Sequence, residues 1–496
     1  MKTFLLRGVP HSVAMDGWWL SGGAPRRPRP GREAGPAAAP GWPLRAGALV
    51  AVIALADVLL WQVMPGLSLA LFGMVLLALA WALAGRHGTP GLFAALLLFL
   101  PVVERVQALS FLFWMAGLAL GAAWIALARW PGLSGAWRFL ALAPLAAFSD
   151  VRHLARLRAP DDLQDRLRHG LLGWFVPIGL GLVFLSLLIE ANPLLENWAD
   201  ALFRWDLSFD IGRLIFWAGI ALLGWPFLRL SAMVERLGRQ IATPAAATPP
   251  AILNPASIRR SLILFNLVFA VQTLSDFAFF TGGASLPDGM SYAQYAHRGA
   301  YPLLVTALLA GAFALAARPF TVRSRALRAA LLGWMGQTLL LVFSSLLRLD
   351  SYISVYGLTI LRLSALVWMG VVAVGIVLVI AQVLRGKSAR WLLTRCTLLG
   401  LATLYLACFT SFSATVARYN LSHDVPHDPW YLCQLDSAVL PAIRAWEAQH
   451  RTGFCGRFGT PEFTPPADWR EWGFRGWRTA RSLAEIEAKA PQWPIF

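Results

Sequence analysis

Two short stretches of this apolar sequence combine tyrosines with cationic side chains, the residue types that bind anions. The first, SYAQYAHRGAYP at 291–302, contains His297, Arg298 and Tyr301. The second, RLDSYISVYGLTILR at 348–362, contains Arg348, Asp350, Tyr352, Tyr356 and Arg362. The planar guanidinium of arginine matches a phosphate or a carboxylate with paired hydrogen bonds. Together the two stretches predict a cationic, tyrosine-lined vestibule whose chemistry is the binding of an anionic group.

The second stretch has the spacing of a helix. If a helix begins near Ser351, four polar residues share one of its faces, namely Tyr352, Tyr356, Thr359 and Arg362. Such a face should point into a helix bundle or a watery cavity, because lipid cannot satisfy an arginine. The alternative is an interfacial belt, in which tyrosine and arginine anchor to lipid headgroups without forming a site.

Ionisable residues also occur inside the predicted membrane segments, where a charge is costly and needs a partner or a function. Asp57 lies about eleven residues into the first segment, and Asp276 with Gln272 lies near the outer end of the seventh. Asp57 either lines a path for a solute, pairs with a neighbouring helix or is protonated in place. Asp276 either lines the same path or faces water at the outer rim.

The composition indicates what kind of protein positions these residues. The chain is 57% hydrophobic and only 14% charged, whereas soluble proteins are about one quarter charged. Continuous apolar runs of about twenty residues match a hydrocarbon core of about 30 Å, and they favour helices over a barrel. The predicted fold class is all-α, a polytopic transmembrane helix bundle of about eleven spans with a small C-terminal extracytoplasmic domain. The spans are expected at 46–64, 67–85, 91–103, 107–128, 171–189, 211–229, 261–281, 301–317, 328–347, 363–384 and 392–414.

The distribution of charge predicts how these spans are oriented. Most lysines and arginines fall in alternate connections, while the intervening loops hold few of them. By the positive-inside rule the N-terminus is cytoplasmic and, with eleven spans, the C-terminal tail is extracytoplasmic. The net charge of +17 thus has a topological explanation, which argues against nucleic acid as a partner. The expected partner is the lipid bilayer, with an anionic lipid or a small solute as a candidate ligand, and the oligomeric state stays open.

Three regions are expected along the chain. Residues 1–45 are expected to be a disordered basic cytoplasmic leader, because 21–45 consists of Pro, Gly, Ala and Arg without periodicity. Residues 46–416 form the transmembrane helical domain, with a cytoplasmic linker near 230–260 that includes ATPAAATPPA. The Ala-rich stretch 139–148 is interpreted as a short interfacial piece. Residues 417–496 form the extracytoplasmic tail.

The tail contains Cys433 and Cys455, and an extracytoplasmic compartment favours a disulfide. Closing a loop of about 23 residues would stabilise the tail by about 3 kcal/mol on the chain-entropy model. The alternative is two unpaired thiols. HDVPHD at 423–428 offers ligand types that zinc accepts, but a solvated loop with helix-capping residues is the favoured interpretation. The sequence predicts no metal site and no cofactor.

Four separated runs, in this order, carry a family resemblance. They are ADVLLWQVMPGLSLALF from Ala56, QTLSDFAFFTGGASLPDGMSYAQYAHRGAYPLLVTALL from Gln272, SSLLRLDSYISVYGLTILRLSALVWM from Ser344 and ARYNLSHD from Ala417. Over roughly residues 45 to 435 the chain resembles a bacterial multi-pass membrane family, the domain of unknown function 4173 with the related domain 4153. The resemblance implies a bacterial integral membrane protein with many helices, and it carries over no catalytic residues.

Three functions remain open from the sequence. The first is a transporter or channel-like protein, with Asp57, Asp276 and the arginines near 348–362 along a path. The second is an envelope enzyme or lipid-binding protein that holds an anionic headgroup through Arg298, Arg348 and Arg362. The third is a sensor or assembly protein in which the tail is the working part. The first is favoured narrowly, because ionisable residues are expected within spans and not only at their ends.

Overall fold

The computed structural model describes residues 42–154, 211–231, 233–234, 254–280 and 292–489 of the 496-residue chain. Every regular element in these residues is a helix, which confirms the all-α part of the predicted fold class for this part of the chain. Residues 1–41 of the predicted leader, the predicted span at 171–189 and the ATPAAATPPA stretch lie outside the described residues. The leader was expected to reach residue 45, but residues 42–45 belong to the first described helix, which begins at Trp42.

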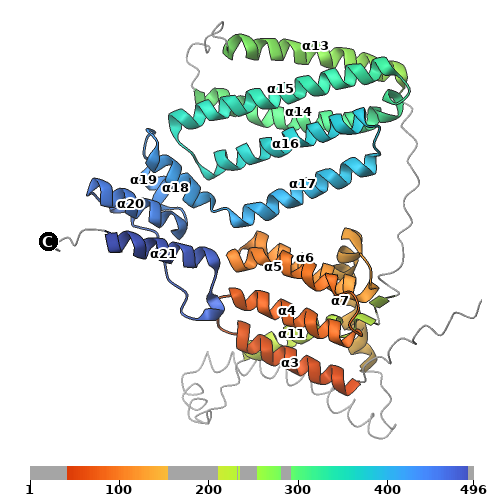
Figure 1. The fold of residues 1–496 in the computed structure, drawn as a ribbon, viewed down its shortest axis with the longest axis vertical. Helices are drawn as coiled ribbons and strands as arrows, with labels where there is room; N and C mark the ends of the chain where they lie inside the picture. The colour runs from red at the N-terminus through yellow and green to blue at the C-terminus, as the bar shows by residue number, and fades with distance from the viewer. Residues whose placement is uncertain (1–41, 155–210, 232, 235–253, 281–291, 490–496) are drawn as a thin grey trace, which may run out of the picture.

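Six helices form a first bundle, drawn from red to yellow-green in Figure 1. They are α3 (Trp42–Leu60), α4 (Leu67–Leu83), α5 (Pro90–Glu104), α6 (Ala108–Leu127), α7 (Gly132–Leu154) and α11 (Ile211–Leu228). Their common core includes Leu77, Phe99 and Trp114. Close approach of α4 to this core requires Gly73, because a Cβ there would lie 2.7 Å from the indole nitrogen of Trp114. That nitrogen donates to the carbonyl of Leu69 at 3.0 Å, so the buried indole is satisfied.

Five helices form the second bundle. They are α13 (Pro255–Phe280), α14 (Tyr292–Thr321), α15 (Arg325–Tyr356), α16 (Ile360–Leu384) and α17 (Ala389–Phe409). Trp334 of α15 centres its core and contacts the rings of Phe265, Phe269 and Phe313 at centroid distances of 4.8, 5.7 and 5.5 Å. In Figure 1, α17 lies between the two bundles, and it contacts both α16 and helices of the first bundle.

Seven of the described helices are long and apolar enough to cross a membrane. Three further apolar segments are shorter, namely Leu67–Leu83, Pro90–Glu104 and Leu308–Thr321, the last of which is part of α14. α5 is one of the shorter helices. Its 15 residues extend about 22 Å at 1.5 Å per residue, less than a hydrocarbon core of about 30 Å. The described residues therefore have the helices of a membrane protein, but the predicted count of eleven spans is not confirmed.

Three expected boundaries are wrong. The Ala-rich stretch 139–148 is not a short interfacial piece but part of the 23-residue helix α7, whose Phe139 is buried in the first core against Phe227. The eighth helix is longer than the span expected at 301–317, because α14 begins at Tyr292 and includes His297 and Arg298. The helix expected to start near Ser351 does not exist as a separate element, since α15 continues to Tyr356.

The tail consists of short helices. They are α18 (Phe412–Ser422), α19 (Pro429–Cys433), η2 (Ser437–Val439), α20 (Leu440–His450), η3 (Gly456–Phe458), η4 (Trp469–Glu471) and α21 (Phe474–Lys489). Leu432, Val439 and Ile443 of the tail share one buried cluster with Ile353 and Leu358 at the α15–α16 turn. The tail core is thus continuous with the end of the second bundle.

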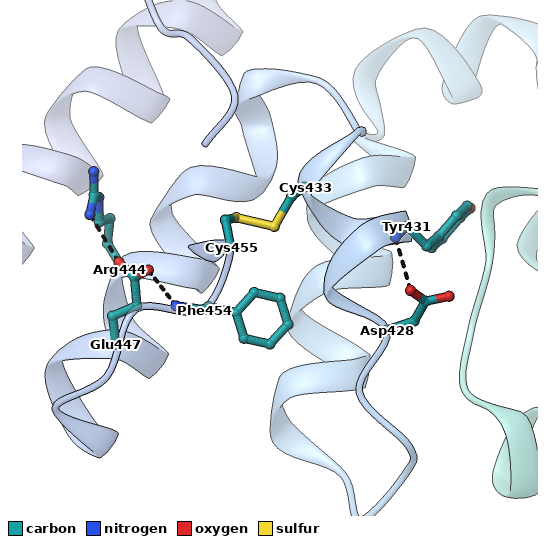
Figure 2. The surroundings of a disulfide bond; sticks show 7 residues. All are labelled: Asp428, Tyr431, Cys433, Arg444, Glu447, Phe454 and Cys455. Carbon is teal, nitrogen blue, oxygen red and sulfur yellow. Dashed lines mark hydrogen bonds and ion pairs between the residues drawn. A yellow bond between two sulfur atoms is a disulfide. The ribbon is translucent and has the colours of Figure 1, made fainter. Parts of the chain in front are cut away.

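A disulfide closes this core. Cys433 and Cys455 are bonded, with their Cα atoms 5.9 Å apart, as Figure 2 shows. On either side of the bridge, Asp428 accepts the amide hydrogen of Tyr431 at 3.0 Å and Glu447 accepts that of Phe454 at 2.8 Å. These carboxylates satisfy backbone groups that would otherwise lack partners at a helix start and in a loop.

The basic connections lie at the end of the bundles away from the tail. In the second bundle these are the α14–α15 and α16–α17 turns, which carry Arg318, Arg323, Arg325, Arg385 and Lys387. The tail instead covers the end where α15 and α16 meet (Figure 1). The described part of the molecule therefore has one basic end and one end capped by the tail.

Candidate functional site

The tail docks on connections of both bundles. At the α3–α4 turn, Leu67 donates its amide hydrogen to the Trp472 carbonyl at 2.8 Å. At the α15–α16 turn, the side chain of Asn420 accepts from Leu358 at 2.6 Å and donates to its carbonyl at 2.9 Å. At the α5–α6 turn, Arg105 forms an ion pair with Asp436. The tail is therefore fixed to segments that lie far apart in the sequence.

Gly66 makes the contact with the α3–α4 turn possible. A Cβ at Gly66 would lie 2.4 Å from the carbonyl carbon of Glu471 and 2.7 Å from the carbonyl oxygen of Trp472. Both are backbone atoms, which cannot move aside as the end of a flexible side chain can. Only glycine permits this approach of the tail backbone.

An arginine beside this contact adds a further link to the first bundle. Arg470 donates to the Val58 carbonyl of α3 at 2.6 Å and to the Asp468 carboxylate at 2.7 Å. The hydrogen bond from Arg470 lowers the pKa of Asp468 below its ordinary value. The ionised carboxylate keeps the guanidinium oriented toward α3.

Arg475 is the residue at which the tail and both bundles meet. Its Nε donates to Glu104 at the end of α5 at 3.2 Å, and its Nη2 donates to the Cys408 carbonyl at the end of α17 at 2.7 Å. Arg478, one turn further along α21, also pairs with Glu104. Glu104 and Arg475 are 4% and 8% exposed. The cation thus offsets a buried carboxylate and the negative end of a helix dipole at the same place.

Two clefts share the wall that contains Arg475. We call the first the arginine cleft; it has a volume of about 560 Å³ and lies between the end of α17 and helices α18, α20 and α21. We call the second the proline cleft; it has a volume of about 510 Å³ and lies between the first bundle and the segment 463–466. Both are lined by Arg475, Ala438 and Thr479, which therefore separate them.

The arginine cleft has the side chains of an anion site. Among the residues that line it, the cations and hydroxyls are Arg418, Arg475, Arg478, Thr410, Ser411, Thr415, Thr479 and Ser482. None of the described residues that line it is acidic. Arg418 has no ion pair within the described part of the chain; its Nε donates to the Ala414 carbonyl at 3.3 Å, which leaves its other N–H groups available. Three arginines therefore surround a space of the size that small ligands occupy, about 300–1,000 Å³.

The predicted intramembrane carboxylate Asp57 lies in an ion pair near the end of its helix. α3 ends at Leu60, so Asp57 lies in its last turn. Its carboxylate pairs with Arg213 of α11 and also accepts from the indole of Trp217 at 2.9 Å. Of the alternatives left open by the sequence, the structure places this carboxylate against a neighbouring helix.

The predicted residues Gln272, Asp276 and Arg348 are brought together in the second bundle. Asp276 of α13 pairs with Arg348 of α15, and both side chains are less than one tenth exposed. The same carboxylate accepts from Gln272 at 2.9 Å and from Ser344 at 2.6 Å. Asp276 is thus buried in a hydrogen-bonded network between two helices and does not face water at a rim.

The predicted stripe on one helix is wrong, although some of its residues do meet. Gly357, with φ of +75°, ends α15, and Thr359 caps the start of α16. Arg362 folds back across this turn: it donates to the Tyr356 carbonyl at 2.9 Å, and its guanidinium lies 4.0 Å from the centre of the Tyr352 ring. Its position is explained by capping the end of α15 and by a cation–π contact.

The rest of the predicted vestibule is not assembled by the described contacts. His297, Arg298 and Tyr301 belong to α14, but their side chains lie outside the described residues. α14 and α15 are consecutive antiparallel helices, so the start of α14 lies at the same end of the bundle as Asp350 and Tyr356. Asp350 is exposed there. The role of these residues as one vestibule stays a prediction.

The sequence interpretation missed Glu104, Arg418, Arg475 and Arg478. A signal for Glu104 was present, because it is the only acidic residue between Met64 and Arg129 and it stands at the end of an apolar run. The arginines gave no comparable signal, since they lie in a tail of ordinary charge. In the described part of the chain, no group of three His, Cys, Asp or Glu side chains is placed to hold a metal ion.

Comparison with known proteins gives a family and no activity. No curated protein and no solved structure matches the chain. A domain of unknown function, DUF4153, matches residues 46–445, which include both bundles and the tail as far as α20. The match is to this domain and does not show a relation to the domain of unknown function 4173. The chain therefore belongs to the DUF4153 family of unknown function.

Proposed function

We propose that this membrane protein binds an anionic group, carried by a lipid headgroup or by a small solute, in the arginine cleft. The observation that carries the proposal is the convergence of Arg418, Arg475 and Arg478 on a cleft without an acidic lining residue. Glu104 compensates only one of the three charges. The site therefore stays cationic, and arginine is the side chain best suited to form bidentate hydrogen bonds with phosphate or carboxylate.

The position of the cleft supports a ligand at the membrane surface. Phe409, Thr410 and Ser411, at the end of the predicted membrane helix α17, form part of its lining. We place this end on the outer side of the bacterial cytoplasmic (inner) membrane, with the N-terminus in the cytoplasm. The support for this orientation is the gathering of basic turns at the opposite end, as the positive-inside rule requires.

The contacts of the predicted path residues favour binding over transport. Asp57 and Asp276 each have an arginine partner on a neighbouring helix. A carboxylate held in this way joins helices and does not need a solute as its partner. The ionisable residues that made a transport path attractive are therefore accounted for by the packing of the two bundles.

Transport remains the second candidate, because α17 forms a discrete contact between the bundles. The Tyr405 hydroxyl donates to the Leu97 carbonyl of α5 at 2.7 Å, and its ring lies 5.3 Å from that of Phe113. A rocking movement of one bundle against the other would have to break this contact and the Arg475–Glu104 pair. Anion flux in proteoliposomes tests this function separately from binding, with Tyr405→Phe as the variant, because that substitution removes the hydrogen bond to Leu97 and Tyr405 does not line the arginine cleft.

Binding is tested with the full-length protein in nanodiscs, by native mass spectrometry. The probes are phosphatidylglycerol as the anionic lipid, phosphatidylcholine as the neutral lipid and inorganic phosphate as the free anion. We expect retention of phosphatidylglycerol or phosphate over phosphatidylcholine. Arg418→Ala should weaken that retention about tenfold, since a hydrogen bond to a charged group contributes about 1.5–3 kcal/mol.

Arg481→Ala is the matched control. Arg481 lies on α21, is exposed and pairs with Glu485 four residues on, and it does not line the arginine cleft. The substitution removes the same charge from the tail. If Arg418→Ala and Arg481→Ala lost the same amount of bound phosphatidylglycerol or phosphate, the binding would reflect only the general attraction of anions to a basic protein. That result would reject the proposed site.

A further inference from the structure

A third cleft lies at the basic end of the second bundle, away from the tail. Its volume is about 200 Å³, and it forms where α14 ends, α15 begins and α16 ends. Its polar lining consists of Arg318, Thr321, Arg328, Gln382 and Arg385. Three helices from one bundle therefore bring three arginines to a space large enough for a phosphate group.

Within the described residues, no carboxylate forms an ion pair with these arginines. Neither 318–328 nor 382–395 contains an Asp or a Glu. Arg318 donates through Nε to the Lys387 carbonyl at 3.2 Å, and Arg328 donates through Nη2 to the Val322 carbonyl at 3.5 Å. Backbone carbonyls thus position the two guanidinium groups but do not neutralise them, and an anion would find them already oriented.

Gln382 provides an independent sign that a ligand belongs in this cleft. The residue is 2% exposed and lines the cleft. Its amide nitrogen Nε2 is buried, and it has no hydrogen-bond partner among the described residues. Buried polar groups in native proteins are nearly always hydrogen-bonded, so an orphaned amide calls for an acceptor. An oxygen of an anion in the cleft would supply one.

The positive-inside rule alone does not explain this arrangement. That rule requires only that basic residues lie in the connections at one end of the bundle, and exposed residues such as Arg390 already satisfy this requirement. It requires neither the convergence of three arginines on one cleft nor a buried amide donor beside them. Both features are expected of a site for a tetrahedral oxyanion, which accepts several hydrogen bonds at once.

We propose that this cleft is a second anion site, which binds a phosphate group through Arg318, Arg328 and Arg385, with Gln382 as a neutral donor. The phosphate belongs either to a lipid headgroup of the adjacent leaflet or to a free phosphate in the aqueous phase. The site lies at the opposite end of the second bundle from the arginine cleft and shares no residue with it. It can therefore be tested whether or not the arginine cleft binds a ligand.

The test is hydrogen exchange of the full-length protein in nanodiscs of phosphatidylcholine. One arm adds inorganic phosphate, and the other replaces part of the lipid with phosphatidylglycerol. We expect slower exchange in 318–328 and 382–390 in at least one arm, with a dissociation constant from the titration. If inorganic phosphate slows exchange, a free anion is sufficient to occupy the cleft. If only phosphatidylglycerol slows exchange, the ligand is a lipid headgroup.

Two variants and a control make the result specific. Gln382→Glu keeps the size of the side chain but replaces a donor with a carboxylate, and Arg385→Ala removes one cation. Each should weaken binding at least about tenfold, the effect of losing one charge-assisted hydrogen bond. Arg390→Ala, which removes an exposed charge outside the cleft, should leave the constant unchanged. The proposal would be overturned if Arg390→Ala weakened binding as much as Gln382→Glu and Arg385→Ala do. It would also be overturned if neither phosphate nor phosphatidylglycerol slowed exchange.

Discussion

Arg475 and Glu104, 371 residues apart in the sequence, form a buried ion pair in which the guanidinium Nε lies 3.2 Å from the carboxylate. The pair joins the last helix of the tail to the end of α5, while the same arginine holds the end of α17. The tail is therefore not an appendage of the helical bundles. It is the segment that links the end of one bundle to the end of the other.

Arg475→Ala should loosen the tail. We expect the free energy of opening the tail to fall by about 1.5–3 kcal/mol, the contribution of hydrogen bonds to a charged group. The larger cost of a fully unpaired buried charge does not apply, because Arg478 still pairs with Glu104. The measurement is hydrogen exchange in 474–489. Arg481→Ala, which removes an exposed i,i+4 pair, should cost only about 0.3–0.5 kcal/mol. A cost for Arg475→Ala as small as that of the control would show that the junction is not a structural link.

Gly66→Ala should separate the tail from the α3–α4 turn. The added methyl group would meet the backbone of Glu471 at 2.4 Å, so one of the two segments must move. We expect faster proteolysis of the segment 460–473 with the helices intact. Gly336→Ala is the control, because nothing lies within 4 Å of a Cβ there and alanine favours a helix. Equal proteolysis of both variants would argue against close approach at Gly66.

The disulfide should determine the stability of the tail more than that of the bundles. Replacing Cys433 and Cys455 by serine removes a cross-link between residues 22 positions apart. The expected cost is about 3 kcal/mol in the chain-entropy model. Hydrogen exchange should increase in 429–458 and stay unchanged in 325–347. Cys396→Ser, which replaces a free cysteine, is the control. Unchanged exchange in the tail of the double variant would contradict a stabilising role for the bridge.

The Asp276–Arg348 pair should behave as a structural clamp. Arg348→Ala leaves a buried carboxylate without its cation, and the cost of breaking such a pair is about 3–5 kcal/mol. The double variant Asp276→Asn with Arg348→Met removes both charges, while the new amide can still accept from Gln272 through its oxygen and donate to the Ser344 hydroxyl through its nitrogen. We expect thermal unfolding in detergent to show a large loss for the single variant and recovery of most of it in the double variant. If the double variant were as unstable as the single one, charge pairing would not be the reason for its stability.

The helices could be predicted from the sequence because continuous apolar runs determine them locally. α16 is an example, since the span expected at 363–384 lies within its observed bounds Ile360–Leu384. The end of α15 was also readable, because Gly357 follows Tyr356 and glycine is common where a helix stops. Tyr352 to Arg362 do not form one helix, because Gly357 ends α15; a glycine is a stronger signal of a helix end than the spacing of polar residues is of a helix.

The partners of the charged residues could not be predicted in the same way. Asp57 pairs with Arg213 across 156 residues, and many arginines in the sequence were equally plausible partners. Arg475 is one of several arginines in the tail, and its burial follows from how α21 docks on α5 and α17. Such contacts depend on how the helices are arranged in space, and apolar periodicity does not determine that arrangement.

The most direct test of the central claim, that the arginine cleft binds an anionic group, is a cryo-electron microscopy map of the full-length protein in phosphatidylglycerol nanodiscs with added phosphate. The claim predicts density for a phosphate group within hydrogen-bond distance of Arg418, Arg475 or Arg478, and its loss in Arg418→Ala. An empty cleft at a resolution that defines these side chains would contradict it.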